Sequence, residues 1–525
     1  MRFLSLFLLL SLVVSGAAAD DQHHKHSEPA KAIADVGRVS FATTCAKDAQ
    51  PRFEHAVALL HSFFYDAARR EFESIAQQDP KCAMARWGVA MTLYRPLWYP
   101  SNPQELAHGA KVLAEANTIG AKTQRERDYI EALSLYFTDV EKTPHPQRAK
   151  AYSDAMNALR QKYADDTEAT IFYALALRAT APPTDKTYKV PLESAALLEP
   201  LFARMPDHPG IAHYLIHDYD FPALAPKGVT AARKYSTIAP AVPHALHMPS
   251  HIFIRLGMWD DAVTSNIASA DSAEKYAREG DALSWNEKIH ALDYLMYAHL
   301  QRADFKAAQA VMDELNAELK QKPTGGSYVL TGGYGGSSIP ARFYVEQRMW
   351  RQAAELKPLE VPPPFQAITY WARALGAAHS GKLEQARADV AQLTELAGKL
   401  KADLLWGNDV EVQRLSAAAW VAHAEGKPGE ALNLMRQARE LEAKTDKHPV
   451  MPGRIWPAYE MLAELLLAQG KPAEALAEYE AALKDQPNRY MALKGAAAAA
   501  EKAGQPEKAS AFRKQLPPAS QHASR

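Results

Sequence analysis

A repeated turn in the last third of the chain constrains the fold more than any other sequence feature. Gly470 is followed five residues later by Ala475, and the same spacing returns 34 residues further on, at Gly504 and Ala509. Glycine readily ends a helix, and the small alanine lets the next helix pack closely against the first. A period of 34 residues is typical of a unit of two antiparallel helices. The repeat therefore predicts an all-α chain of stacked helix pairs.

The same spacing between a turn and a small residue recurs through much of the chain. The further pairs are Gly426 with Ala431, Gly381 with Ala386, Gly257 with Ala262, Ala303 with Ala308, and Arg348 with Ala353. In this pattern the chain resembles tetratricopeptide-repeat (TPR) proteins, and the resemblance implies a right-handed solenoid. A solenoid also suits a length of 525 residues, because each repeat buries apolar surface only against its neighbours.

The chain divides into five predicted segments. They are a signal peptide (1–19), an N-terminal tail and docked segment (20–49), N-terminal TPR-like helical repeats (50–207), central TPR repeats with a histidine-rich groove and a glycine-rich insert (208–360), and C-terminal TPR repeats (361–525). Within the second segment, the apolar residues 36–42 are expected to dock in an extended form. The glycine-rich residues 325–336 have no strand or lysine of a phosphate-binding loop, so we expect a loop between repeats that covers the groove.

The first 20 residues predict export. Arg2 precedes a nearly continuous apolar run over residues 3–14, and three alanines end at Ala19. This is the pattern of a secretory signal that is cleaved after Ala19. The run is short for a bilayer and no other stretch approaches about 20 apolar residues, so no transmembrane anchor is expected. The mature chain is expected in the periplasm or outside the cell.

Cysteine and charge content narrow the chemistry. Cys45 and Cys82 are the only cysteines, and an oxidising compartment predicts a disulfide between them, with two free buried thiols as the alternative. The 60 Lys and Arg residues nearly balance the 61 Asp and Glu residues. A balanced chain has no strong field to hold a polyanion, so neither a nucleic acid nor an anionic membrane is expected as a partner.

Histidines recur at helical spacing in the central segment. Residues three or four apart share one face of a helix, and imidazole pairs at that spacing are typical ligands of transition metals. The predicted ligands are His213, His217, His244, His247 and His251. The predicted supporting residues are Asp218, His290, Asp293 and Tyr294, with Tyr214, Tyr219 and Asp220 as further candidates to orient the imidazoles. Copper, zinc and iron are not distinguished by these ligand types.

The TPR resemblance also implies where these side chains point. Positions two, five, nine, twelve and thirteen of the first helix of such a repeat line the concave groove. When Ala262 and Ala308 are set at position twenty of their repeats, His244, His247, His251 and the residues around His290 occupy these positions. On the same count Arg255 and Arg342 face the groove, and such cations suit a carboxylate or phosphate on a bound molecule.

Three interpretations of the histidines stay open at this stage. They form a metal site, they line a hydrogen-bonded groove that binds a ligand without metal, or they are separate core residues. Pro249 indicates that a helix begins just before His251, because proline is accepted in a first turn, and that His244 and His247 lie on a preceding turn.

The strings HYLIHDYD at residues 213–220 and HALHMPSHIF at residues 244–253 add a second resemblance. They are similar to those of a group of exported bacterial TPR proteins, and further short matches extend over nearly the whole mature chain. This resemblance implies the fold and the export but supplies no reaction.

Two functions follow as hypotheses. The first is an exported protein with a transition metal in its concave groove, which would act as a hydrolase or an oxidoreductase on a small anionic molecule or peptide. The second is a non-enzymatic scaffold that binds a peptide or a partner protein in the groove, which is the common role of such solenoids. A groove rich in imidazole and tyrosine favours the first.

Overall fold

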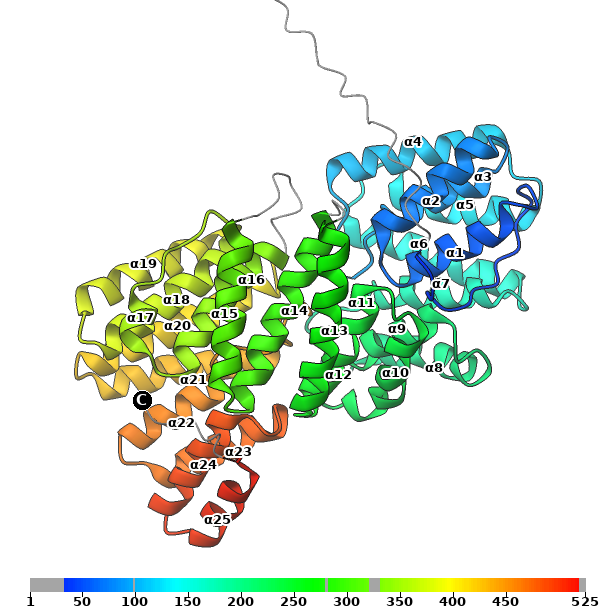
Figure 1. Ribbon diagram of the computed structural model, residues 1–525. Coiled ribbons are helices and arrows are strands. Elements are labelled where there is room, and N and C mark those ends of the chain that lie inside the picture. Colours follow the sequence, from blue (N-terminus) through cyan, green and yellow to red (C-terminus); the bar gives the residue numbers. More distant parts are fainter. Residues whose placement is uncertain (1–32, 98–99, 279–281, 321–330, 519–525) are drawn as a thin grey trace, which may run out of the picture. The chain divides into compact units, whose positions relative to one another are not determined.

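The computed structural model describes residues 33–97, 100–278, 282–320 and 331–518, and over these ranges it contains helices and connecting segments with no β-strand. Consecutive helices lie side by side in pairs (Figure 1). The prediction of an all-α solenoid of stacked helix pairs is confirmed. The predicted signal peptide (1–19) lies outside the described residues. In the described part of the chain, every helix is too short or too polar to cross a membrane.

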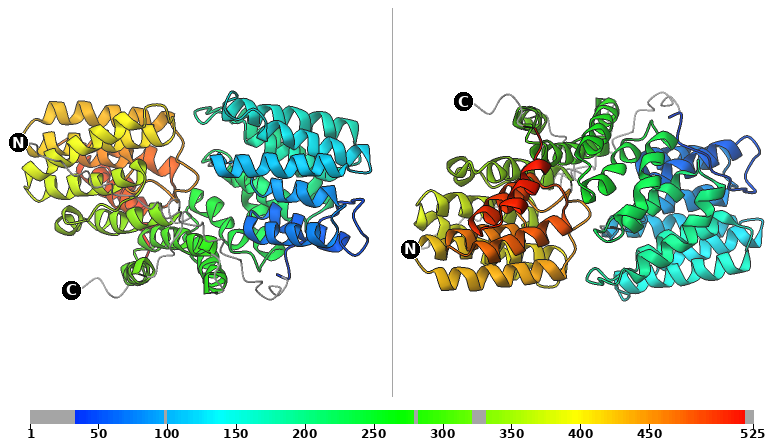
Figure 2. Two further views of the ribbon diagram at one scale, coloured as in Figure 1. Left: turned by 90° about the horizontal axis from the view of Figure 1, so that it is seen from above. Right: turned by 90° about the horizontal axis from the view of Figure 1, so that it is seen from below.

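The helices follow one another with short connections, and the views in Figure 2 show the same side-by-side packing of neighbours. The first are α1 (Gln50–His61), α2 (Tyr65–Gln78), α3 (Ala83–Met91), α4 (Pro103–Ile119), α5 (Gln124–Phe137), α6 (His145–Lys162), α7 (Thr167–Arg178) and α8 (Lys189–Arg204). The central ones are α9 (Pro209–Tyr219), α10 (Ala225–Ile238), α11 (Pro243–His247), α12 (Pro249–Arg255), α13 (Trp259–Arg278), α14 (Ala282–Gln301), α15 (Phe305–Lys320), α16 (Thr331–Glu346) and α17 (Trp350–Ala354). The last are α18 (Pro363–His379), α19 (Leu383–Lys399), α20 (Trp406–Ala424), α21 (Pro428–Lys444), α22 (Ala458–Ala468), α23 (Pro472–Asp485), α24 (Tyr490–Lys502) and α25 (Pro506–Gln515).

The repeated turn has one backbone conformation. Its five glycines have φ between 65° and 75°, which is the left-handed region that commonly follows a helix. Ala303 (φ 53°) and Arg348 (φ 58°) take the same conformation without glycine. The small residue five positions later is fully buried in each of the seven units. The spacing therefore marks a helix end followed by a close helix contact, as the sequence predicts.

The N-terminal segment docks on the first helices without forming a strand. Phe41 is fully buried, and its ring lies 5.6 Å from the ring of Phe53 and 5.4 Å from that of Trp87, measured between centroids. Cys45 and Cys82 are joined by a disulfide. Together these contacts attach residues 36–45 to α1 and α3.

The glycine-rich segment differs from its prediction. Its first part, residues 325–330, lies outside the described residues, but the loop predicted for its remainder is wrong, because α16 begins at Thr331. A Cβ atom on Gly332 would come within 2.5 Å of the Trp285 ring, and one on Gly335 within 2.5 Å of Ile289. The glycines are thus small residues that let α16 pack closely on α14.

Residues near the C-terminus pack against the central helices. The hydroxyl of Tyr297 on α14 accepts a hydrogen bond from Nη1 of Arg489 (3.0 Å), and the indole of Trp259 donates to the carbonyl of Asn488 (2.9 Å). Arg342 on α16 donates to the carbonyl of Gly453 (2.7 Å). These contacts join residues 453, 488 and 489 to the central helices α13, α14 and α16.

Candidate metal centre

Six histidines from four helices meet in the middle of the chain. They are His213 and His217 on α9, His244 and His247 on α11, His251 on α12 and His290 on α14. All six are buried, and the most exposed, His244, retains 9% of its accessible surface. Pro249 begins α12 as the sequence predicts, whereas the turn predicted for His244 and His247 is the short helix α11.

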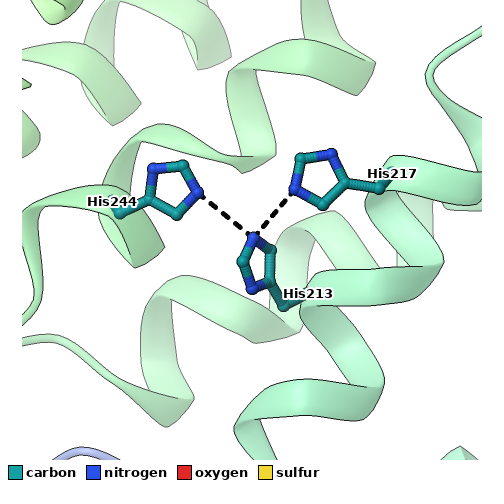
Figure 3. A group of neighbouring side chains, drawn as sticks. All are labelled: His213, His217 and His244. Atoms are coloured by element: carbon teal, nitrogen blue, oxygen red, sulfur yellow. Dashed lines mark hydrogen bonds between the residues drawn. The ribbon is translucent and has the colours of Figure 1, made fainter. Parts of the chain in front are cut away.

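His213, His217 and His244 form the first triad. The Nε2 atom of His213 lies 3.0 Å from Nε2 of His217 and 3.2 Å from Nε2 of His244. Figure 3 shows both outer rings directing a nitrogen at the same nitrogen of His213. The two α9 histidines meet because residues four apart lie one above the other on a helix, and α11 supplies the third.

His247, His251 and His290 form the second triad. The Nε2 atoms of His247 and His251 lie 3.1 Å apart, and the ring of His290 lies 4.4 Å from that of His247 between centroids. In each triad, one possible ligand atom from every member lies within 4.8 Å of the others. His290, which the sequence predicts as a supporting residue, is thus a full member of a triad.

Outward hydrogen bonds determine the tautomers of His213 and His251. Nδ1 of His213 lies 2.6 Å from the main-chain carbonyl oxygen of His61, and a carbonyl can only accept, so Nδ1 carries the proton. Nδ1 of His251 donates in the same way to the Asp220 carboxylate, 2.9 Å away. Asp220 is held in turn by Nε of Arg255, at 2.8 Å.

His247 is oriented by an amide. Its Nδ1 lies 2.7 Å from Oδ1 of Asn266 on α13. The amide nitrogen of Asn266 donates to the carbonyl of Ala262 at 2.8 Å, which identifies Oδ1 as the atom facing the histidine. Oδ1 can only accept, so His247 also carries its proton on Nδ1.

These tautomers place lone pairs on three inward-facing nitrogens. A neutral imidazole has one N–H and one lone pair, so Nε2 of His213, His247 and His251 each present a lone pair to the cluster. The lone pairs of His247 and His251 face each other across 3.1 Å, and a cation placed against both would relieve their repulsion. Metal-binding histidines characteristically donate the other N–H to a carbonyl or carboxylate. Nitrogens bound tetrahedrally at about 2.0–2.1 Å lie roughly 3.3–3.4 Å apart, close to the spacings here.

Burial favours the neutral form of five of the six histidines. It holds the pKa values of His213, His217, His247 and His290 well below 6.5. Burial also lowers the pKa of His251, although the nearby Asp220 carboxylate acts in the opposite direction. Because a metal binds only the unprotonated nitrogen, these sites do not need to lose a proton at neutral pH before binding.

Aromatic rings flank both triads. The ring of Phe63 lies 4.4 Å from that of His213 and 5.7 Å from that of His244. Tyr294 places its ring 4.5 Å from His247 and its hydroxyl 3.2 Å from Nε2 of His251. These rings cover apolar sides of the imidazoles and bring one hydroxyl to the second triad.

The concave groove expected from the sequence is covered at this point. The Tyr294 hydroxyl lies 3.4 Å from the carbonyl of Pro449 and 3.3 Å from that of Met451. Nζ of Lys447 lies 3.6 Å from the Asp220 carboxylate. Residues 447–451 therefore pack beside the second triad, against Tyr294 and Asp220. The repeat register of a single helix pair could not show this contact.

The two carboxylates predicted to support the ligands face other groups. Asp218 accepts a hydrogen bond from Ser194 at 2.7 Å, and burial raises its pKa to about 8. Asp293 accepts from Ser338 at 3.0 Å and lies 3.8 Å from Arg342; burial raises its pKa to about 6. Two other carboxylates face the histidines: Asp220, one of the further candidates from the sequence, contacts Nδ1 of His251 at 2.9 Å, and Glu287 lies 3.6 Å from Nδ1 of His244.

The two arginines predicted to bind an anion have carboxylate partners within the protein. Arg255 binds Asp220 through Nε and also donates to its main-chain carbonyl. Arg342 is fully buried and pairs with Glu346 at 3.2 Å. The geometry gives no support to an anion-binding role for either residue, and it makes Arg255 a positioning residue for Asp220 instead.

A further buried cluster supports His213 from behind. Glu168 accepts hydrogen bonds from Nε2 of His61 (2.9 Å) and Nε2 of His208 (2.8 Å), and the Tyr214 hydroxyl lies 2.8 Å from Nδ1 of His61. Burial alone would raise the pKa of Glu168, but the two imidazoles outweigh it and lower this pKa to about 2. The cluster holds His61, whose carbonyl oxygen orients His213.

Sequence reasoning missed Asn266 and the carbonyl of His61. Asn266 lies four residues after Ala262 on the second helix of its repeat, and His61 lies 152 positions from His213. Neither residue carries a local signal, because a main-chain carbonyl or a lone amide becomes a hydrogen-bond partner only when distant helices pack together.

No protein-family model and no curated protein matches this sequence. The chain is similar to the structure of Naa15/Naa10 bound to HypK-THB, with 14% identity over 90% of this chain and 64% of that chain and a TM-score of 0.24. It is similar to a human IFIT1 dimer with m7Gppp-AAAA at 13% identity, over 83% of this chain and 89% of that one, with a TM-score of 0.34. The APC/C hetero-tetramer Cut9-Hcn1 matches at 11% identity over 86% and 90%, with a TM-score of 0.29. Values this low carry no argument about function.

Proposed function

We propose that this chain is an exported TPR-type protein that binds a transition metal, copper, zinc or iron, through its buried histidines. The observation that carries the proposal is the set of outward hydrogen bonds from His213, His247 and His251, which leave their Nε2 lone pairs converging at 3.0–3.2 Å from neighbouring imidazole nitrogens. Metal-binding histidines characteristically make such outward hydrogen bonds to a carbonyl or a carboxylate. Export is supported by the signal-like pattern of residues 1–19.

A metalloenzyme is the function we favour for this site. Three imidazoles leave a coordination position open, and a bound ion there would polarise a substrate or activate a water molecule. All six histidines are buried, and residues 447–451 pack beside the second triad, so the site suits a small molecule better than a peptide. Tyr294 places a hydroxyl beside the second triad, where it could donate a hydrogen bond to such a molecule.

Metal binding by untagged protein tests the proposal. The full chain is purified without a histidine tag, its metal content is measured by mass spectrometry, and copper(II) and zinc(II) are titrated in by calorimetry. The His213→Ala and His247→Ala double variant should lose tight binding. His379→Ala is the matched control, because His379 is a half-buried histidine on α18 that stacks on Trp350. Equal binding by wild type and the double variant would reject the metal site in favour of a scaffold that binds a partner without metal.

A further inference from the structure

The two triads are joined by a short helix. α11 is five residues long and carries one member of each triad, His244 near its start and His247 at its end. Both triads repeat one design, a pair of histidines four residues apart completed by one histidine from another helix. The pair is His213 and His217 in the first triad, and His247 and His251 in the second. A shift of α11 would displace ligands of both triads at once.

The triads also approach each other through two pairs of rings. The ring of His217 lies 6.3 Å from that of His251, and the ring of His244 lies 6.3 Å from that of His247, measured between centroids. An ion bound at Nε2 lies about 3 Å from the centroid of its own ring. Rings at these separations can therefore serve two ions that are neighbours, as in two-metal sites whose ions lie about 3.5–4 Å apart.

Charge restricts what such a pair of ions can be. All six imidazoles are neutral ligands. The nearby carboxylates lie at outer Nδ1 atoms: Asp220 at His251, where it also faces Arg255 and Lys447, and Glu287 at His244, 3.6 Å away. Two divalent ions would bring four positive charges into a buried site without a carboxylate ligand, which is costly. The cost falls if the ions are monovalent or if an anion bridges them. Copper has a monovalent state, and in its divalent state it binds nitrogen ligands more tightly than the other first-row metals.

Carboxylate-poor ligation separates this site from the iron and manganese pairs of helical bundles. Those sites take a glutamate from each of several helices and place carboxylates between the ions. Here each triad is imidazole only, and Asp220 contacts the outer nitrogen of His251 rather than the space between the triads.

We propose that the two triads form one binuclear centre that holds two copper ions, with a small oxygen ligand such as hydroxide bridging them in the divalent state. This inference rests on the proposed function, because it requires that the histidines bind metal. It adds the number of ions, their identity and the class of the bridging ligand. Each triad contributes three ligands to its ion, and the bridge occupies the open position of both.

Copper stoichiometry and electron paramagnetic resonance (EPR) test the proposal together. The full-length protein is loaded with copper(II) sulfate, excess metal is removed, and bound copper is counted by mass spectrometry. Wild type is expected to hold two ions per chain with an EPR signal far below two spins, because neighbouring bridged copper(II) ions are magnetically coupled. Acid release of the metal should restore the full signal, which distinguishes coupling from reduction to copper(I).

Single-triad variants provide the decisive comparison. His217→Ala in the first triad and His290→Ala in the second should each bind one copper with a full one-spin signal, and His379→Ala should behave as wild type. Circular dichroism checks folding, and His290→Gln replaces His290→Ala if that variant unfolds. One ion per chain in wild type, or two ions with two uncoupled spins, would overturn the binuclear centre while leaving metal binding intact. Tighter binding of zinc than of copper would overturn the choice of metal, and absence of all metal binding would reject the proposed function as well.

Discussion

Asp218 and Asp220 lie two residues apart and are both buried, yet the structure predicts a large loss of stability when Asp220 is changed to asparagine and a small one when Asp218 is. Asp220 accepts hydrogen bonds from His251 and Arg255 and faces Lys447 at 3.6 Å. Burial alone would raise the pKa of Asp220, but the cations Lys447 and Arg255 and the hydrogen bond from His251 hold it well below the usual range. Burial instead raises the pKa of Asp218 to about 8, so that this side chain is mostly neutral at pH 7.

The expected costs follow from the charge that each substitution leaves behind. Asp220→Asn removes the anion that compensates Arg255, and a guanidinium cannot be deprotonated to escape burial. Lys447 can relax in part, since burial already lowers its pKa to about 7. Breaking a buried ion pair from one side typically costs about 3–5 kcal/mol. Asp218 lies 3.7 Å from Nε of Arg178, but its carboxyl is mostly neutral at pH 7. Asp218→Asn therefore leaves a neutral amide that can still accept from Ser194, and we expect about 1 kcal/mol or less.

Hydrogen exchange followed by mass spectrometry is the suitable assay, because segments of a repeat protein can open separately. At pH 7, Asp220→Asn should lower the opening free energy of peptides from α9 and α12 by about 3 kcal/mol or more, whereas Asp218→Asn should leave it nearly unchanged. Metal affinity should also fall about 10- to 100-fold in Asp220→Asn, since the partner of a ligand histidine is lost. Equal losses of opening free energy in the two variants would refute the electrostatic reasoning.

Three further predictions concern parts of the chain away from the two histidine triads. Ala303→Gly should stabilise α14 and α15 by about 0.5–1 kcal/mol, because residue 303 has a positive φ that glycine adopts without strain. Ala308→Gly in the same repeat should destabilise these helices. Thermal denaturation of both variants measures the sign of each change, and destabilisation by Ala303→Gly would contradict the prediction. Reduction and alkylation of the disulfide, which joins residues 37 positions apart, should lower the free energy of unfolding by about 4 kcal/mol in the chain-entropy model. Hydrogen exchange in α1 and α3 measures this loss, with unreduced protein as the control. Burial lowers the pKa of His379 to about 3, so only the unfolded state gains a proton just below pH 6.5 and stability should fall there by about 1.4 kcal/mol per pH unit. His379→Phe should lack this part of the acid sensitivity of α18, and an unchanged pH profile would count against a neutral His379.

The fold could be predicted from the sequence to a large extent because its main signal is local. The spacing from Gly470 to Ala475 describes a helix end and a close contact within a single repeat, and the structure places the left-handed residue and the buried alanine where the spacing predicts. Ala303 and Arg348 show that the spacing is informative even without glycine. The glycines of α16 were interpreted wrongly, because glycine marks a loop or a close helix contact equally well, and only Trp285 and Ile289 on the neighbouring helix decide between them.

For the site, the sequence by itself determined which imidazoles pair locally, since His213 and His217 are four residues apart on one helix and His247 and His251 have the same spacing across the junction of α11 and α12. Only the tertiary structure decided that His244 joins the first pair and that His290 joins the second. It also decided that Asp220 rather than Asp218 contacts a ligand. The packing of the neighbouring helices places His251 beside Asp220 and Ser194 beside Asp218. Helical periodicity relates residues within one turn of each other, whereas the division into two triads depends on the packing of helices that are distant in sequence.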